Sequence, residues 1–161
     1  MAASPVKKSD STSSARIKAR NNYVMRFLKP GDLVRFDRHL YDHWAVYIGD
    51  SKVVHITKEK PMDKSCGKIC VDDLMSVAGK SKVYIANERD FRYTPRSPEK
   101  IVQKAKMCVG SVSYNLLSRN CEHFANYCRY GQRVSEQILF LGSPAKELRD
   151  RSLHSDSLFD E

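Results

Sequence analysis

The pattern of apolar and polar residues predicts short β-strands in the first half of the chain. Residues 32–37 read DLVRFD and follow a turn-forming Pro-Gly pair. Residues 43–50, HWAVYIGD, are rich in β-branched and aromatic residues and end at a Gly-Asp pair, and residues 52–57, KVVHIT, follow closely. The two runs predict an antiparallel hairpin. Shorter apolar runs predict two further strands at 68–71 and 81–85.

The second half of the chain shows helix start and stop signals instead. Residues 97–110, SPEKIVQKAKMCVG, open with the Ser-Pro pair typical of a helix N-cap and first turn and close with glycine. Residues 119–131, RNCEHFANYCRYG, place an asparagine at the N-cap and also close with glycine. Shorter helices are predicted at 72–79 and 135–140. Strands followed by helices indicate an α+β fold, with an antiparallel sheet packed against helices.

Polar and charged residues dominate both ends of the chain. Residues 1–22 are rich in Ser, Lys, Arg and Asn and predict a disordered basic arm. Residues 142–161 are polar and predict a loosely ordered tail. The length of 161 residues suits one domain between these ends, over residues 23–141.

The charge of the chain adds an expectation about its partners. Twenty-eight Lys and Arg against 19 Asp and Glu give a net charge of +9, and residues 1–38 alone carry nine basic and three acidic residues, a net +6. Such a surface favours an anionic partner, although basic runs are also common simply as solvated surface. The sequence has no recognised nucleic-acid motif, so nucleic acid is not expected. We expect peripheral contact between the basic arm and an anionic membrane.

Cysteine usage and the first residues together predict a reducing compartment. The five cysteines cannot all pair internally, and residues 1–10, MAASPVKKSD, lack the apolar stretch of a secretory signal. Cys66 and Cys70 have three residues between them, and no second Cys/His pair with ligand spacing follows, so neither a metal site nor a cofactor is expected. No run approaches 18 apolar residues, which predicts a cytoplasmic chain without a transmembrane helix.

Cys121 is the first candidate for chemistry, because it falls in the first turn of the helix predicted at 119–131. The partial positive charge of a helix N-terminus favours the thiolate form of a cysteine. The competing interpretation is a small buried apolar side chain, which is a common role of free cysteines. A nucleophilic cysteine also needs a base, most often a histidine that a third group holds in place.

Five histidines are available as that base. His123 lies two residues after the cysteine on the same predicted helix and therefore projects to a different side. His39 falls in a loop and His154 in the tail. His43 and His55 occupy the two strands of the predicted hairpin, where an isolated histidine is more often structural, but two on one hairpin are the better candidates.

The connection between the strands decides whether His43 and His55 meet. Residues directly opposite in an antiparallel pair share a face. A two-residue loop places the two histidines on opposite faces, whereas a three-residue loop at 49–51 sets Ala45 opposite His55 and puts both imidazoles on one face. Gly49 supplies the left-handed backbone that the longer loop needs. We therefore predict a three-residue loop or an equivalent bulge.

Four segments together resemble a known superfamily. PGDLVRF, YDHWAVYIGD, VVHI and NCEHFANYCRYG occur in this order within about residues 29–140 and are similar to the lecithin:retinol acyltransferase superfamily, which is itself similar to NlpC/P60 proteins. The closer similarity is to the H-rev107-like branch, the phospholipase A/acyltransferases. The resemblance implies a permuted papain-like fold, in which the His-bearing strands precede the Cys-bearing helix, so residues 23–141 are expected to form the catalytic domain.

The resemblance also implies a role for each matching residue. Cys121 is expected to be the nucleophile, His43 the general base and acid, and His55 the residue that orients His43. Tyr41, two residues before His43, matches a position associated with the oxyanion. The implied activity is acyl transfer on glycerophospholipids, as phospholipase A1/A2 hydrolysis and N- or O-acyl transfer through a Cys121 thioester, with no metal or other cofactor.

Two other functions fit part of the same pattern. An NlpC/P60-type cysteine peptidase or amidase keeps the fold and changes the substrate, and a non-catalytic basic interaction module keeps the fold alone. Many members of the branch that the chain resembles carry a hydrophobic C-terminal anchor. Residues 142–161 of this chain are polar and charged instead. We therefore expect salt-sensitive contact with anionic lipid in place of membrane insertion.

Overall fold

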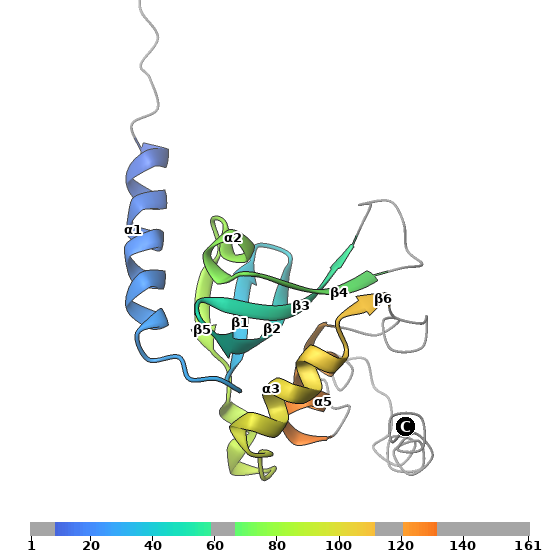
Figure 1. Ribbon diagram of the computed structural model, residues 1–161. Helices are drawn as coiled ribbons and strands as arrows, with labels where there is room; N and C mark the ends of the chain where they lie inside the picture. The colour runs from blue at the N-terminus through green and yellow to red at the C-terminus, as the bar shows by residue number, and fades with distance from the viewer. Residues whose placement is uncertain (1–8, 59–66, 112–120, 132–161) are drawn as a thin grey trace, which may run out of the picture.

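One antiparallel sheet organises the protein (Figure 1). The computed structural model describes residues 9–58, 67–111 and 121–131, and within them the sheet has six strands in the order β5-β1-β2-β3-β4-β6. The strands are β1 Leu33–Arg38, β2 Tyr41–Gly49, β3 Lys52–Lys58, β4 Gly67–Asp73, β5 Lys82–Ile85 and β6 Gly110–Ser111. The helices are α1 Ser9–Met25, α2 Leu74–Ala78, α3 Pro98–Met107 and α5 Cys121–Tyr130, with a 3-10 helix η1 at Glu88–Phe91.

Successive strand residues pack into two apolar layers, one on each face of the sheet. Leu33 and Val46 belong to the layer that includes residues of α3 and α5. Their neighbours Val34 and Ala45 belong to the layer that includes α2 and the end of α1. The α+β class is confirmed, with an antiparallel sheet packed against helices and the His-bearing strands before the Cys-bearing helix.

The hairpin between β2 and β3 has the predicted register. Its loop is the pair Asp50 and Ser51, both with positive φ, and a bulge that ends at Gly49 shifts the pairing by one residue. Ala45 therefore stands opposite His55, as a three-residue loop also requires. The prediction of a three-residue loop or an equivalent bulge is therefore confirmed by the bulge. Gly49 has the predicted left-handed backbone, with φ +94°.

Helix α1 corrects the prediction of a disordered arm over residues 1–22, because residues 9–22 belong to a continuous helix that ends at Met25. The segment has no apolar stripe of the kind that predicts a packed helix, and this is why the pattern failed to indicate it. The helix stands beside the edge strand β5, which its C-terminal half contacts (Figure 1).

Polar side chains attach α1 to β5. Asn21 is fully buried; its Oδ1 accepts a hydrogen bond from the backbone N–H of Val83 at 3.0 Å, and its Nδ2 donates to the carbonyl of Ser81 at 2.9 Å. Arg20 donates to the Val83 carbonyl at 2.8 Å and lies over the Tyr84 ring. These bonds occupy backbone groups of an edge strand that would otherwise be open to pairing with another chain.

Two element boundaries differ from the predicted ones. The helix predicted at 72–79 begins only at Leu74, because Asp73 is its N-cap and accepts from the N–H of Ser76 at 3.0 Å. Asp72 therefore belongs to strand β4. The helix predicted at 97–110 ends at Met107, and its expected stop residue, Gly110, begins the short strand β6.

Some predictions fall where the structure gives no description. The helix predicted at 135–140 and the tail over residues 142–161 lie outside the described residues. The limits of the domain, residues 23–141, remain a prediction.

Candidate active site

The hairpin register brings His43 and His55 together in the interior. Both side chains are buried, and Nε2 of His43 lies 2.9 Å from Nδ1 of His55. The two rings are nearly perpendicular, with centroids 5.1 Å apart. The ring of Phe36, on the neighbouring strand β1, packs against His43. The prediction that both imidazoles share one face is confirmed.

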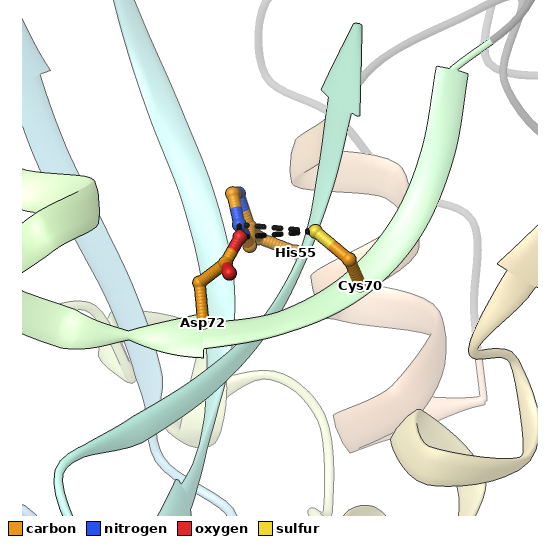
Figure 2. Close-up of side chains that lie close together, drawn as sticks. All are labelled: His55, Cys70 and Asp72. Atoms are coloured by element: carbon orange, nitrogen blue, oxygen red, sulfur yellow. Dashed lines mark hydrogen bonds and ion pairs between the residues drawn. The ribbon is translucent and has the colours of Figure 1, made fainter. Parts of the chain in front are cut away.

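A carboxylate that the sequence analysis did not identify continues this chain of hydrogen bonds. Oδ2 of Asp72 lies 2.8 Å from Nε2 of His55. The register sets Cys70 opposite His55, and Asp72, two residues further along β4, points to the same face (Figure 2). No local motif marks Asp72, and the pattern of residues 72–79 predicted a helix there, so the pairing of β3 with β4 is the signal that was lacking.

The thiol of Cys70 also contacts this pair. Its Sγ lies 3.1 Å from Oδ2 of Asp72 and 3.4 Å from Nε2 of His55 (Figure 2). Burial and the hydrogen bond to Asp72 raise the pKa of the Cys70 thiol to about 12. The hydrogen bond from His55 lowers the pKa of Asp72, so this carboxylate is ionised at neutral pH. The three side chains offer a nitrogen, a sulfur and an oxygen of the kinds that bind metal ions.

The order of these contacts determines which nitrogen of His43 is basic. An ionised carboxylate only accepts hydrogen bonds, so Nε2 of His55 carries the proton that points to Asp72. In a neutral ring the other nitrogen, Nδ1, then accepts, and it accepts from Nε2–H of His43. His43 is left with an unprotonated Nδ1. The chain of hydrogen bonds thus orients His43 and selects one tautomer, which is what a general base requires.

The surroundings of His43 keep it uncharged. Burial, followed by the nearby His55 and Arg38, lowers the pKa of His43 from 6.5 to about 3. Arg38 is held in place by hydrogen bonds to the Val77 carbonyl, at 3.1 Å, and to the hydroxyl of Tyr41, at 3.2 Å. At neutral pH the imidazole of His43 is therefore uncharged.

Cys121 is the first residue of α5 and lies against β2. Its Sγ donates to the carbonyl of Asp42 at 3.7 Å and also contacts the backbone N–H of Trp44. Asp42 and Trp44 are the two residues on either side of His43, so the thiol lies against the strand segment that carries this histidine. The predicted helix end is also observed, because Gly131 has φ +74° and donates to the Tyr127 carbonyl.

The protonation of Cys121 differs from what the helix position alone predicts. Burial raises the pKa of the Cys121 thiol, and this effect outweighs the backbone N–H groups of Trp44, Glu122 and Cys121, which lower it. The resting pair is consequently a neutral thiol and a neutral imidazole. The predicted N-cap, Asn120, lies outside the described residues.

Two ion pairs hold α5 in place. Arg129 binds Asp90 through two hydrogen bonds, at 3.0 and 2.6 Å, and donates to the Gly31 carbonyl at 2.9 Å. Glu122, next to Cys121, is buried and pairs with Arg89 of η1 at 2.9 Å. The helix that carries the thiol is therefore held at both ends.

Comparison with known proteins assigns the chain to a family. The family described as lecithin retinol acyltransferase matches residues 26–134, which include both hairpin histidines and the cysteine of α5. The chain belongs to this family. The H-rev107-like branch is confirmed as the closer similarity by relatives that carry the name phospholipase A and acyltransferase.

Relatives in this lecithin retinol acyltransferase family align over most of their length. The chain is 40% identical over 124 residues to "Phospholipase A and acyltransferase 3" of Mus musculus, covering 68% of this chain and 75% of the relative. It is 39% identical over 123 residues to "Phospholipase A and acyltransferase 2" of Homo sapiens, covering 67% and 74%. It is 38% identical over 119 residues to "Phospholipase A and acyltransferase 1" of Homo sapiens, covering 67% and 71%.

Two expectations that follow from the family remain: a role for Tyr41 at the oxyanion and contact of the chain with a membrane. Tyr41 lies at the start of β2 with 54% of its surface exposed, and its hydroxyl accepts from Arg38. Its role at an oxyanion stays a prediction. Among the helices in the described ranges, none combines the length and apolar character needed to cross a bilayer.

Proposed function

We propose that this chain is a cysteine-dependent phospholipase A and acyltransferase that cleaves glycerophospholipid esters. The observation that carries the proposal is the hydrogen-bonded chain Asp72–His55–His43, which leaves an unprotonated ring nitrogen on the strand segment that the thiol of Cys121 contacts. Relatives of the same family are named for both activities, hydrolysis and acyl transfer.

The first half of the reaction forms a thioester. Sγ of Cys121 attacks the ester carbonyl while Nδ1 of His43 takes the thiol proton. The backbone N–H of Cys121, at the start of α5, donates to the oxyanion of the tetrahedral intermediate, and Tyr41 is the candidate for a second donor. The intermediate collapses, and His43 returns the proton to the departing lysophospholipid alkoxide. His55 and the carboxylate of Asp72 stabilise the imidazolium that exists between these two transfers.

The second half of the reaction transfers the acyl group. Water, an amine or a hydroxyl attacks the Cys121 thioester, and His43 takes a proton from this acceptor. The thiolate leaves and recovers the proton from His43, which restores the starting state. Each step is a proton or acyl transfer between named groups, so the proposed cycle assigns no step to a metal ion.

The decisive experiment measures fatty-acid and lysophospholipid release from phosphatidylcholine and phosphatidylethanolamine vesicles, with a chelator present. Wild type is expected to release both products, and Cys121→Ala is expected to lose release. Cys108→Ala is the matched control, because this half-buried thiol lies at the end of α3 in the layer that also contains α5. Full release by the Cys121→Ala protein contradicts the proposal. Cleavage of peptide amides without release from vesicles indicates a peptidase instead.

Helix α1 is the proposed contact with the membrane surface. Tyr23, in its last turn, and Phe27, two residues beyond it, are exposed aromatic rings that pack edge to face, with centroids 5.1 Å apart. Lys18 and Arg26 add positive charge to the same stretch of chain. Amphipathic aromatic rings beside lysine and arginine suit the interface of an anionic bilayer.

Vesicle sedimentation tests this contact directly. Vesicles that contain phosphatidylserine are expected to bind the protein more than pure phosphatidylcholine vesicles, and salt is expected to weaken the binding. The double variant Lys18→Gln/Arg26→Gln is expected to bind less. Lys104→Gln/Lys106→Gln on α3 removes the same charge elsewhere and is the control. Equal binding by the two double variants contradicts a specific role for α1.

A further inference from the structure

His55, Cys70 and Asp72 form a compact set of ligand atoms on neighbouring strands (Figure 2). Oδ2 of Asp72 lies 2.8 Å from Nε2 of His55 and 3.1 Å from Sγ of Cys70, and this Sγ lies 3.4 Å from Nε2 of His55. Two of the three side chains come from β4 and one from β3, and the strand register holds all three on one face. Among the described residues, this is the group of three metal-ligand side chains that lies close enough to share one ion.

The distances fit a small tetrahedral cation. Zinc binds nitrogen, sulfur and oxygen at about 2.0–2.3 Å, which places neighbouring ligand atoms about 3.3–3.6 Å apart. The observed separations need to open by only about half an ångström, which side-chain rotation supplies. A mixed nitrogen, thiolate and carboxylate set suits zinc and cobalt, whereas magnesium and calcium prefer oxygen ligands.

An entering ion has a route to these atoms. The side chain of Asp72 is 51% exposed, Cys70 is half-buried, and His55 lies beneath them at 8% exposed. The ion reaches the carboxylate first and the imidazole last. Three protein ligands leave a fourth tetrahedral position for water, which is the arrangement of an open site.

We propose that His55, Cys70 and Asp72 bind a zinc-class divalent cation that switches the enzyme off. The inhibitory effect rests on the function proposed above, whereas binding of the metal does not. The ion occupies Nε2 of His55, the nitrogen that otherwise carries the proton facing Asp72. The inhibition follows from where that proton goes.

The proton balance is complete without any further reactant. The ion takes the lone pair of Nε2, so the ring proton of His55 moves to Nδ1, and the thiol proton of Cys70 passes to solvent. Nδ1–H of His55 now donates to Nε2 of His43, whose own proton moves to Nδ1. His43 remains neutral but presents an N–H where it previously had a lone pair. It can no longer accept the proton of Cys121.

Cobalt binding tests the site without any need for activity. The Cys121→Ala protein, which lacks the catalytic thiol, is titrated with cobalt(II) and observed by absorption spectroscopy. We expect one equivalent of tetrahedral cobalt with a thiolate-to-cobalt charge-transfer band. The band is expected to disappear in Cys121→Ala/Cys70→Ala and to persist in Cys121→Ala/Cys108→Ala and Cys121→Ala/Cys66→Ala. A band that persists when Cys70 is replaced overturns the proposal. A band that is lost when Cys66 is replaced instead also overturns it.

Zinc inhibition tests the consequence for catalysis. Zinc is expected to inhibit product release by wild type, and chelator to restore it. Loss of an outer-shell partner typically weakens metal affinity about 10–100-fold, so loss of the ligand Cys70 is expected to raise the half-inhibiting zinc concentration at least about tenfold. Each variant is compared with its own metal-free rate. Equal zinc sensitivity of wild type and Cys70→Ala overturns the switch and indicates that zinc acts at Cys121 itself.

The two experiments separate the possible failures. A wild type that releases no product without metal refutes the proposed function, and cobalt binding still decides whether the site exists. If wild type is active but no cobalt band depends on Cys70, the metal site alone is refuted.

Discussion

At the scale of single residues, the candidate site depends on protons held in a fixed order. Asp72 accepts from His55, and His55 accepts from His43, so the charge of one half-exposed carboxylate decides where the lone pair of a buried imidazole lies. Asp72 touches no reacting atom in this scheme. It is a positioning residue, and its effect reaches the chemistry only through the tautomer of His43.

Asp72→Asn is expected to lower kcat by about tenfold, because the amide no longer requires a proton on Nε2 of His55. Nitrogen NMR of the imidazoles in the Cys121→Ala background is expected to show a mixture of tautomers at His43. Asp72→Glu keeps the charge and is expected to recover part of the rate. Asp73→Asn removes a neighbouring charge while asparagine still caps α2, so it is the control. An unchanged tautomer in Asp72→Asn would falsify the positioning role.

At the scale of elements, polar side chains decide where two helices dock. Asn21 attaches α1 to the edge strand β5, and Arg129 attaches α5 to Asp90 and to the backbone of Gly31. Asn21 is a buried polar residue on α1, and Arg129 is one of the buried polar residues on α5. A lost anchor therefore leaves buried donors and acceptors without partners.

Asn21→Ala is expected to lower the free energy of unfolding by about 1–3 kcal/mol, since the N–H of Val83 and the carbonyl of Ser81 lose their partner. Chemical denaturation measures the change. Asn22→Ala is the matched control, because Asn22 is exposed on the same helix. Equal destabilisation by the two substitutions would show that helix propensity, not the buried bonds, is responsible.

Arg129→Met is expected to lower the free energy of unfolding by about 2 kcal/mol and to reduce kcat, because α5 loses the contacts that orient it. The loss is moderate because Asp90 is 40% exposed and water can solvate it after the change. Denaturation and vesicle assays measure the two effects. Arg92→Met, an exposed arginine just after η1, is expected to change neither. A destabilised variant with the kcat of wild type would separate the helix anchor from the site.

At the scale of the whole molecule, the buried His43 links folding to pH. Its pKa is 6.5 in an unfolded chain and about 3 in the folded one, so the unfolded state binds more protons between these values. The stability that His43 contributes is fully present above pH 6.5 and declines as the pH falls toward 3. One proton corresponds to a slope of about 1.4 kcal/mol per pH unit.

His43→Gln is expected to reduce the pH dependence of unfolding by up to about 1.4 kcal/mol per pH unit between pH 4 and 6. Denaturant titrations of wild type and variant at each pH, with chelator present, measure the difference. His39→Gln is the control, because His39 is not buried. Parallel stability curves for wild type and His43→Gln would mean that His43 binds its proton equally well in both states.

The sequence alone predicted the elements whose signals lie within a few neighbouring residues, and it missed contacts between residues that are far apart along the chain. Caps, alternation and glycine positions act within a few residues, so they predicted strands β1 to β5, α3, α5 and the register that places His43 beside His55. Asn21 and Asp72 act through strands that are remote in sequence, and no local pattern marks such a contact. The expected thiolate at Cys121 failed for a related reason, because burial is a property of the folded chain.

The order of the groups along the chain has a consequence for biosynthesis. The hairpin with both histidines is complete by residue 58, whereas the thiol comes at residue 121, on the last helix of the described residues. During translation this hairpin leaves the ribosome first. One of its apolar faces then stays exposed until α3 and α5 emerge. In the proposed mechanism the nascent protein is therefore inactive until α5 emerges and docks on β2. A chain that ends before α5 exposes an apolar sheet face, which chaperones recognise.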